Sequence, residues 1–130
     1  MTSEALQQAA LEARLNAWAP FSKFLVGAAL ESSADGRIYT GCNVENATYG
    51  LTICAERVAV FKAISEGARG FSRIAIAADT DSLTPPCGAC RQILWEFCQD
   101  IEVILVNPRG MSESMRLSEL FPRPFDASFL

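Results

Sequence analysis

Two short segments hold most of the side chains that can do chemistry: Cys54-Ala55-Glu56-Arg57 and Pro86-Cys87-Gly88-Ala89-Cys90-Arg91-Gln92. A Cys-x-x-Cys pair at the start of a helix brings two sulfurs to one side, at about the spacing that a tetrahedral metal ion needs. Cys54 can add a third sulfur from a second helix. Three protein ligands leave one tetrahedral position open, as in catalytic zinc, whereas structural zinc is normally closed by four. A water in the open position can lose a proton near neutral pH, and Glu56, two residues after a ligand, is well placed to take it.

The charge of such a site points to further residues. Three thiolates around Zn²⁺ leave a net charge of −1, which makes the ion a poorer Lewis acid than one with imidazole ligands. Arg57 and Arg91 each directly follow a residue of this predicted site. We expect their guanidinium groups to donate to the thiolates and withdraw electron density from them. The N-termini of the two helices favour thiolates in the same way.

The composition excludes several other kinds of site. The chain has 130 residues and no histidine. Ser-His-Asp triads, Cys-His dyads and zinc sites built on imidazole are therefore excluded, and proton chemistry near neutral pH must come from carboxylates, thiols, lysines or metal-bound water. A formal charge of −4, with Lys23 and Lys62 as the two lysines, argues against a nucleic acid partner.

Length and cysteine usage predict one domain, residues 1–130, in a reducing compartment. Five cysteines, an odd number, fit a closed disulfide framework poorly. The first residues lack the basic region and the apolar run of a secretory signal, and no stretch approaches the ~20 apolar residues that span a bilayer. We therefore expect a cytoplasmic protein without a membrane partner.

The elements that position these residues follow from hydrophobic spacing and turn residues. A helix is expected over 3–18, capped by Ser3, and then a hairpin whose strands, 25–30 and 37–44, flank the turn sequence Ser-Ser-Ala-Asp-Gly. The later elements are a helix over 54–66, a buried strand over 74–78, a helix from Pro85-Pro86 to about Phe97, a buried strand over 103–106 and a short element over 117–121. This order predicts an α/β layered domain with a mixed sheet.

The combined motifs resemble a known family. Cys-x-Glu followed about thirty residues later by Pro-Cys-x-x-Cys is similar to the signature of zinc-dependent deaminases, with cysteine in place of the usual histidine. The longer segments Phe21–Leu30 and Gly41–Arg57 resemble the small, homotetrameric cytidine deaminases, and the resemblance runs from about residue 5 to 125. It implies a three-layer α/β/α cytidine deaminase-like fold with a mixed sheet of about five strands.

The resemblance also implies a reaction. Cys54, Cys87 and Cys90 would bind one Zn²⁺ per chain. A zinc-bound hydroxide would attack C4 of the pyrimidine, with Glu56 as the proton shuttle to N3 and then to the departing amino group. Cytidine and 2′-deoxycytidine would thus be hydrolysed to uridine and 2′-deoxyuridine plus ammonia, a step of pyrimidine salvage.

Further positions take their expected roles from the same resemblance. Asn43 and Glu45 match residues that hold the sugar hydroxyls, and such side chains suit hydroxyl groups chemically. The backbone of Ala55 would contact the pyrimidine edge, and Phe24 would pack near the base. Phe125 matches an aromatic residue that reaches into the site of a neighbouring subunit, so the active site would be complete only in a homotetramer. Around the metal ligands, the expected supporting residues are Arg57, Arg91 and Gln92.

Other interpretations remain open at this point. One is a deaminase of another small aminopyrimidine nucleoside, such as a nucleoside antibiotic. Another is a non-enzymatic zinc or dithiol module, because Cys87-Gly-Ala-Cys90 alone is also typical of a redox pair at a helix start. Cys42 and Cys98 lack ligand-type spacing and are expected to be buried as small apolar residues. Trp18 and Trp95 are expected in the core.

Overall fold

A mixed sheet of five strands forms the centre of the computed structural model, which describes residues 1–130. The strands are β1 (Val26–Ser32), β2 (Ile38–Cys42), β3 (Phe71–Ala78), β4 (Glu102–Val106) and β5 (Ser112–Arg116), in the order β2-β1-β3-β4-β5. β3 and β4 run parallel, and the other neighbours are antiparallel. The parallel pair needs a crossover, and α3 provides it.

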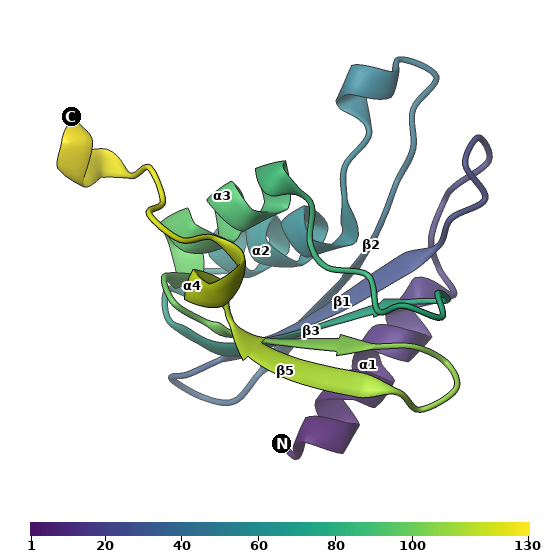
Figure 1. Cartoon of the computed structure of the whole chain (residues 1–130), viewed down its shortest axis with the longest axis horizontal. Coiled ribbons are helices and arrows are strands. Elements are labelled where there is room, and N and C mark those ends of the chain that lie inside the picture. Colours follow the sequence, from purple (N-terminus) through teal and green to yellow (C-terminus); the bar gives the residue numbers. More distant parts are fainter.

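Helices cover both faces of this sheet. α1 (Ser3–Arg14) packs on one face, whereas α2 (Ala55–Ser65) and α3 (Gly88–Cys98) lie on the other (Figure 1). The remaining elements are a short helix α4 (Leu117–Leu120) and two 3-10 turns, Tyr49–Leu51 and Ala127–Phe129. The expected three-layer α/β/α arrangement with five strands is therefore confirmed. None of the helices has both the length and the apolar character needed to cross a membrane.

Side chains of the central strands alternate between two cores. On β3, Ile74 and Ile76 point into the larger core under α2 and α3, and Ala75 and Ala77 point into the smaller one under α1. Strands covered on both faces read as continuous apolar runs, which is why the sequence marks β1, β3 and β4 so clearly. The small residues on the α1 side let that helix lie close to the sheet.

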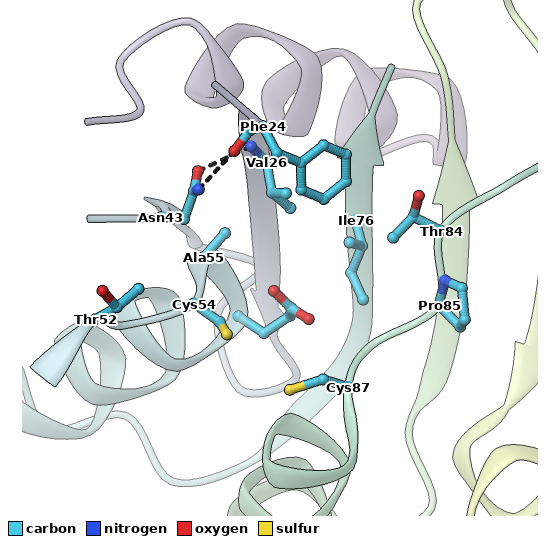
Figure 2. Close-up of a pocket in the computed structure, with 11 residues that line it drawn as sticks. Phe24, Val26, Asn43, Thr52, Cys54, Ala55, Ile76, Thr84, Pro85 and Cys87 are labelled. Atoms are coloured by element: carbon cyan, nitrogen blue, oxygen red, sulfur yellow. Dashed lines mark hydrogen bonds between the residues drawn. The ribbon is translucent and has the colours of Figure 1, made fainter. Parts of the chain in front are cut away.

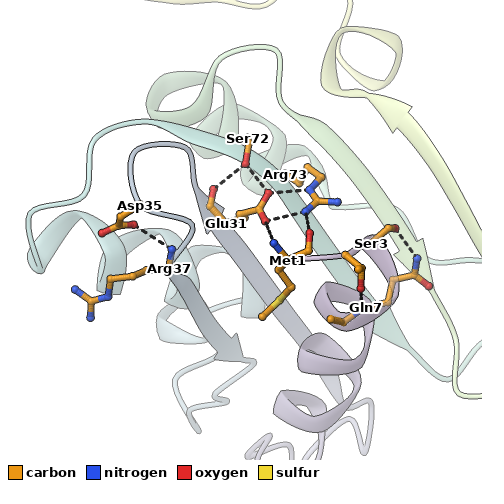
Figure 3. Close-up of polar contacts among 10 residues, drawn as sticks. Met1, Ser3, Gln7, Glu31, Asp35, Arg37, Ser72 and Arg73 are labelled. Atoms are coloured by element: carbon orange, nitrogen blue, oxygen red, sulfur yellow. Dashed lines mark hydrogen bonds and ion pairs between the residues drawn. The ribbon is translucent and has the colours of Figure 1, made fainter.

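A buried ion pair joins the two central antiparallel strands (Figure 3). Glu31 on β1 lies opposite Arg73 on β3, and the guanidinium donates from Nε and Nη2 to the two carboxylate oxygens at 2.8 and 2.7 Å. Ser72 adds a hydrogen bond of 2.6 Å, and the amino group of Met1 lies 3.8 Å from the same carboxylate. The Arg73 hydrogen bond is the main cause that lowers the pKa of Glu31 to about 2.

The first helix is shorter than the sequence indicates. It begins after Thr2, whose hydroxyl accepts from the Ala5 amide at 3.1 Å, so the cap predicted at Ser3 is wrong by one residue. It ends at Arg14 rather than at residue 18. The chain then runs beside residues 43–45, and the Trp18 amide donates to the Asn43 carbonyl at 3.0 Å. This backbone pairing competes successfully with the last helical turn.

Two further expectations about the core and the sheet differ from the structure. Trp18 is 62% exposed, so its placement in the core is wrong. Trp95 is partly buried against the larger core, and its indole N–H donates to Asp126 at 3.0 Å. β5 was not expected, because the sequence Ser-Glu-Ser-Met-Arg has no apolar alternation. It is an exposed edge strand that pairs with β4 along one side only.

Candidate active site

Two helix N-termini bring the three predicted sulfur ligands together. Cys54 is the N-cap of α2, Cys87 is the N-cap of α3, and Cys90 lies in the first turn of α3. Their sulfur atoms all lie within 4.8 Å of one another, and all three cysteines are free thiols. With Zn–S bonds of about 2.3 Å, tetrahedral geometry places the sulfurs roughly 3.8 Å apart. The cluster therefore fits a zinc ion after small adjustments.

The position of α2 depends on a glycine of the neighbouring strand. A Cβ at Gly41 of β2 would lie 2.6 Å from the carbonyl oxygen of Ala55 and 2.6 Å from the amide nitrogen of Ala59. The absence of a side chain thus lets the first turn of α2 rest on the backbone of β2. This contact sets the position of Cys54 and Glu56 at the start of the helix.

Hydrogen bonds polarise the sulfur cluster. A hydrogen bond from Cys90, together with the Arg57 guanidinium, lowers the pKa of the Cys54 thiol, and the same sulfur–sulfur hydrogen bond, with burial, raises that of Cys90. Arg57 Nη2 donates to Cys54 Sγ at 3.3 Å. Its Nε is buried without a partner. The protein therefore supplies a cation beside the site where thiolate charge collects.

The Glu56 side chain is buried next to these sulfurs. It is 5% exposed, and burial is the main cause that raises its pKa to about 7. A cation held by the thiols would act in the opposite direction and favour the carboxylate. Because burial favours the protonated form and a bound cation would favour the carboxylate, this group is suited to both take and give a proton, which is what a proton shuttle requires.

Cys54, Glu56 and Cys87 line a pocket next to the sulfur cluster, and Figure 2 shows this pocket. In the figure, the sulfurs of Cys54 and Cys87 lie at one end, and the ring of Phe24 covers the other. The walls are mostly apolar, with polar atoms at a few points, as is typical of small-molecule sites. The lining residues are Phe24, Val26, Asn43, Thr52, Cys54, Ala55, Glu56, Ile76, Thr84, Pro85 and Cys87.

The two residues predicted to hold a sugar line two different spaces, Asn43 the pocket and Glu45 a neighbouring hollow. Asn43 is buried, and its amide is partly used within the protein: Oδ1 accepts from the Val26 amide at 2.9 Å, and Nδ2 donates to the Phe24 carbonyl at 2.7 Å. Glu45 lines a second hollow with Phe21, Ser22, Tyr49 and Thr52. Because Thr52 lines both spaces, the hollow and the pocket adjoin each other.

The remaining predicted site residues lie outside the pocket. Arg91 donates from Nε to the Pro86 carbonyl at 2.8 Å and from Nη1 to the Leu120 carbonyl, so its guanidinium holds the segment before Cys87 rather than a sulfur. Gln92 Nε2 donates to the Phe125 carbonyl at 2.8 Å. The Phe125 ring is 57% exposed, stacks on Phe129 and does not line the pocket of its own chain.

Several lining residues were not singled out from the sequence. Ile76 belongs to β3, and Thr84 and Pro85 belong to the loop that leads into α3. The sequence could have indicated Pro85, because Pro85-Pro86 directly precede Cys87 of the Cys-x-x-Cys motif, and a residue so near a predicted ligand is expected near the site. Ile76 is an apolar strand residue like its neighbours and carries no signal of its own.

Comparison with known proteins agrees with this geometry. Residues 1–106 match the family model described as "Cytidine and deoxycytidylate deaminase zinc-binding region". A cytidine deaminase of Sporosarcina psychrophila is 48% identical over 126 residues, which cover 96% of this chain and 92% of the relative. A cytidine deaminase of Halalkalibacterium halodurans is 49% identical over 128 residues, with 98% and 96% coverage.

The fold leads to the same family. The crystal structure of cytidine deaminase from Burkholderia pseudomallei superimposes with a TM-score of 0.93 and 46% sequence identity, covering 96% of this chain and all of that one. The chain belongs to the cytidine and deoxycytidylate deaminase family, whose shared feature is a zinc-binding region.

Proposed function

We propose that this chain hydrolyses cytidine and 2′-deoxycytidine to uridine and 2′-deoxyuridine, releasing ammonia. The observation that carries the proposal is the buried carboxyl group of Glu56 beside three clustered thiols at one end of a mostly apolar pocket. A flat aminopyrimidine fits such a pocket, and the clustered groups supply what hydrolysis at C4 requires: a nucleophile and a proton carrier.

Each group of the chain has a task in this reaction. Cys54, Cys87 and Cys90 hold the zinc, which when bound lowers the pKa of water and so supplies a nucleophile near neutral pH. Arg57 donates to Cys54 and limits the electron density that the sulfur gives to the ion. Glu56 would take one proton from the water and pass it to N3 of the ring, where it stays. It would then take the proton of the new C4 hydroxyl and pass it to the amino group, which leaves as ammonia as C4 becomes a carbonyl.

Binding of the nucleoside divides between the pocket and the adjoining hollow. Phe24 packs near the base, and the backbone of Ala55, at the start of α2, meets the pyrimidine edge. After its internal bonds, Asn43 keeps one N–H to donate. Glu45 can accept from a hydroxyl, so a sugar hydroxyl that accepts from Asn43 and donates to Glu45 satisfies both.

We further propose that the working form is a homotetramer with shared active sites. Phe125 is exposed, stacks on Phe129, and is held by Gln92 and not by its own pocket. An aromatic pair of this kind at the end of the chain suits insertion into a neighbouring subunit.

Residues 1–130 act as one domain in this proposal, because both cores share the same sheet. A cytoplasmic location suits five free cysteines, three of which must stay reduced.

The test is turnover of defined substrates by protein with measured zinc content. Ultraviolet absorbance follows cytidine, 2′-deoxycytidine, free cytosine and a cytidine-containing oligonucleotide. We expect turnover of the two nucleosides, about one zinc per chain, and loss of at least about 10³-fold in kcat for Glu56→Gln, which keeps the shape of the side chain. Glu96→Gln, on the exposed side of α3, is the matched control and should retain wild-type kcat.

Four results would contradict parts of this proposal. Zinc-loaded protein that turns over neither nucleoside would reject the substrate assignment and direct the search to other aminopyrimidines. Wild-type kcat in zinc-loaded Glu56→Gln would reject the proton shuttle. Reduced protein that binds no zinc would reject the metal site. If the Phe125→Ala variant is an active monomer with unchanged KM, the proposal that subunits share active sites is rejected.

A further inference from the structure

One short segment ties the sugar end of the site together through the hydroxyl of Ser22. Glu45 Oε1 accepts from the amides of Phe21 and Ser22 at 2.9 and 3.1 Å. Glu45 Oε2 accepts from the Ser22 hydroxyl. Ser22 is thus the one side chain that hydrogen-bonds to the Glu45 carboxylate, and it also donates through its backbone.

The same hydroxyl reaches toward the base. Ser22 Oγ accepts from the amide of Phe24 at 3.0 Å, whose ring lines the pocket. The Phe24 carbonyl in turn accepts from Asn43, and Asn43 accepts from Val26. A continuous chain of hydrogen bonds therefore runs from Glu45 to Asn43, with the Ser22 hydroxyl as its link. These hydrogen bonds surround Lys23, which has a φ of 62°, a value that residues other than glycine rarely adopt.

Counting acceptor positions shows what Ser22 controls. A carboxylate offers about four lone-pair positions, and three donors from residues 21 and 22 occupy three of those on Glu45. The remaining one lies on Oε2, the oxygen that Ser22 binds. With the two amides holding Oε1, the Ser22 hydroxyl on Oε2 fixes which lone pair of Glu45 stays free, and hence where a ligand hydroxyl can donate.

We propose that Ser22 is a positioning residue for the sugar of the substrate: its hydroxyl orients the Glu45 carboxylate and couples it to Phe24, so that nucleosides bind through a sugar hydroxyl. The inference rests on the proposed nucleoside deamination. Ser22 itself touches no reacting atom, so it affects substrate affinity and not the chemical step. The lowered pKa of Glu45, caused first by the Ser22 hydrogen bond, agrees with a carboxylate kept charged for this task.

The test compares Ser22→Ala with two matched variants in zinc-loaded protein. Ser22→Thr keeps the hydroxyl, and its extra methyl has room because residue 22 is exposed. Ser65→Ala removes an exposed hydroxyl at the end of α2 that donates to a backbone carbonyl. Steady-state kinetics use cytidine and its 2′-deoxy, 3′-deoxy and 5′-deoxy analogues, and thermal unfolding shows whether each variant is folded.

For Ser22→Ala we expect KM for cytidine to rise about tenfold, as for loss of a hydrogen bond to a charged group, with kcat within about threefold. The rise should shrink to less than about twofold with the one analogue that lacks the hydroxyl bound by Glu45. Ser22→Thr and Ser65→Ala should keep wild-type KM, and all three variants should unfold like the wild type.

An equal rise in KM for all four nucleosides would overturn the inference, because it would show general support of the loop. Unchanged KM in Ser22→Ala, or equal loss in Ser22→Thr and Ser22→Ala, would also overturn it. These results leave the proposed function standing, since the wild type is active in each. Wild-type protein inactive on every nucleoside would overturn both.

Discussion

Replacing Gly41 by alanine tests how the sheet positions the catalytic helix. The new Cβ would lie 2.6 Å from backbone atoms of Ala55 and Ala59, both in α2. Ordinary van der Waals contact begins at 3.4 Å, so α2 and β2 must separate by about 0.8 Å at this point. Backbone atoms of a packed helix cannot rotate away as a flexible side chain does, so the helix must move as a unit.

That displacement falls on Cys54 and Glu56, which we propose bind zinc and carry the proton. Overpacking of this kind costs about 1–3 kcal/mol, and in a chain of this size each kcal/mol lowers Tm by roughly 3–5 °C. A misplacement of about 1 Å can reduce catalysis on the order of 10²-fold. For Gly41→Ala we therefore expect a lower Tm, a kcat reduced by about 10- to 100-fold, and weaker zinc retention through Cys54.

The assay measures Tm, zinc per chain and kcat on the same preparations. Gly50→Ala is the matched control, because a Cβ at Gly50 meets no atom within 4 Å. Full zinc content with a reduced kcat would assign the effect to Glu56 rather than to the metal ligands. Gly41→Ala with wild-type Tm, zinc content and kcat would refute the reasoning that this contact holds α2 in place.

Two further predictions concern charge. Arg57→Ala removes the 3.3 Å hydrogen bond to Cys54, so the thiol becomes more basic. We expect kcat near neutral pH to fall by about tenfold or more, with a smaller effect on Tm. Unchanged kcat across the pH range would contradict this role. Glu31→Gln breaks the buried pair with Arg73. A pKa lowered from 4.5 to about 2 corresponds to at most about 3 kcal/mol of stability, fully present above about pH 4.5 and lost as the pH falls toward 2. Urea unfolding at pH 7 and at pH 3 should therefore show a large difference from the wild type that narrows in acid; an equal difference at both pH values would reject the ion pair as its source.

Most of the sheet was predictable because its central strands are buried on both faces. Runs such as Ile74–Ala78 and Val103–Val106 are apolar without interruption, and burial of both faces requires that. β5 could not be found in this way, since an edge strand with exposed faces has no need of apolar residues. The end of α1 was missed for a related reason: pairing of Trp18 with Asn43 is a contact between distant parts of the chain.

The metal cluster was predictable from local spacing. Cys-x-x-Cys and Cys-x-Glu lie at helix starts, and a helix start fixes the direction of its first side chains. The two arginines show where local spacing stops being enough. Arg57 follows Cys54 by three residues and reaches its sulfur, whereas Nε and Nη1 of Arg91 donate to the carbonyl oxygens of Pro86 and Leu120. The Leu120 oxygen is far away in the sequence, so spacing alone could not place it.

The site thus has two ends that depend on different parts of the fold. The sulfurs and Glu56 are held by two helix starts and by the contact of α2 with Gly41. The proposed sugar end is held by the hydrogen bonds of Ser22 to Glu45 and Phe24. In the proposed reaction, the groups at the first end touch the reacting atoms, and the groups at the second end touch only the sugar. Gly41→Ala should therefore act mainly on kcat and Ser22→Ala mainly on KM, and their effects on kcat/KM should add, because the two positions share no hydrogen-bond partner.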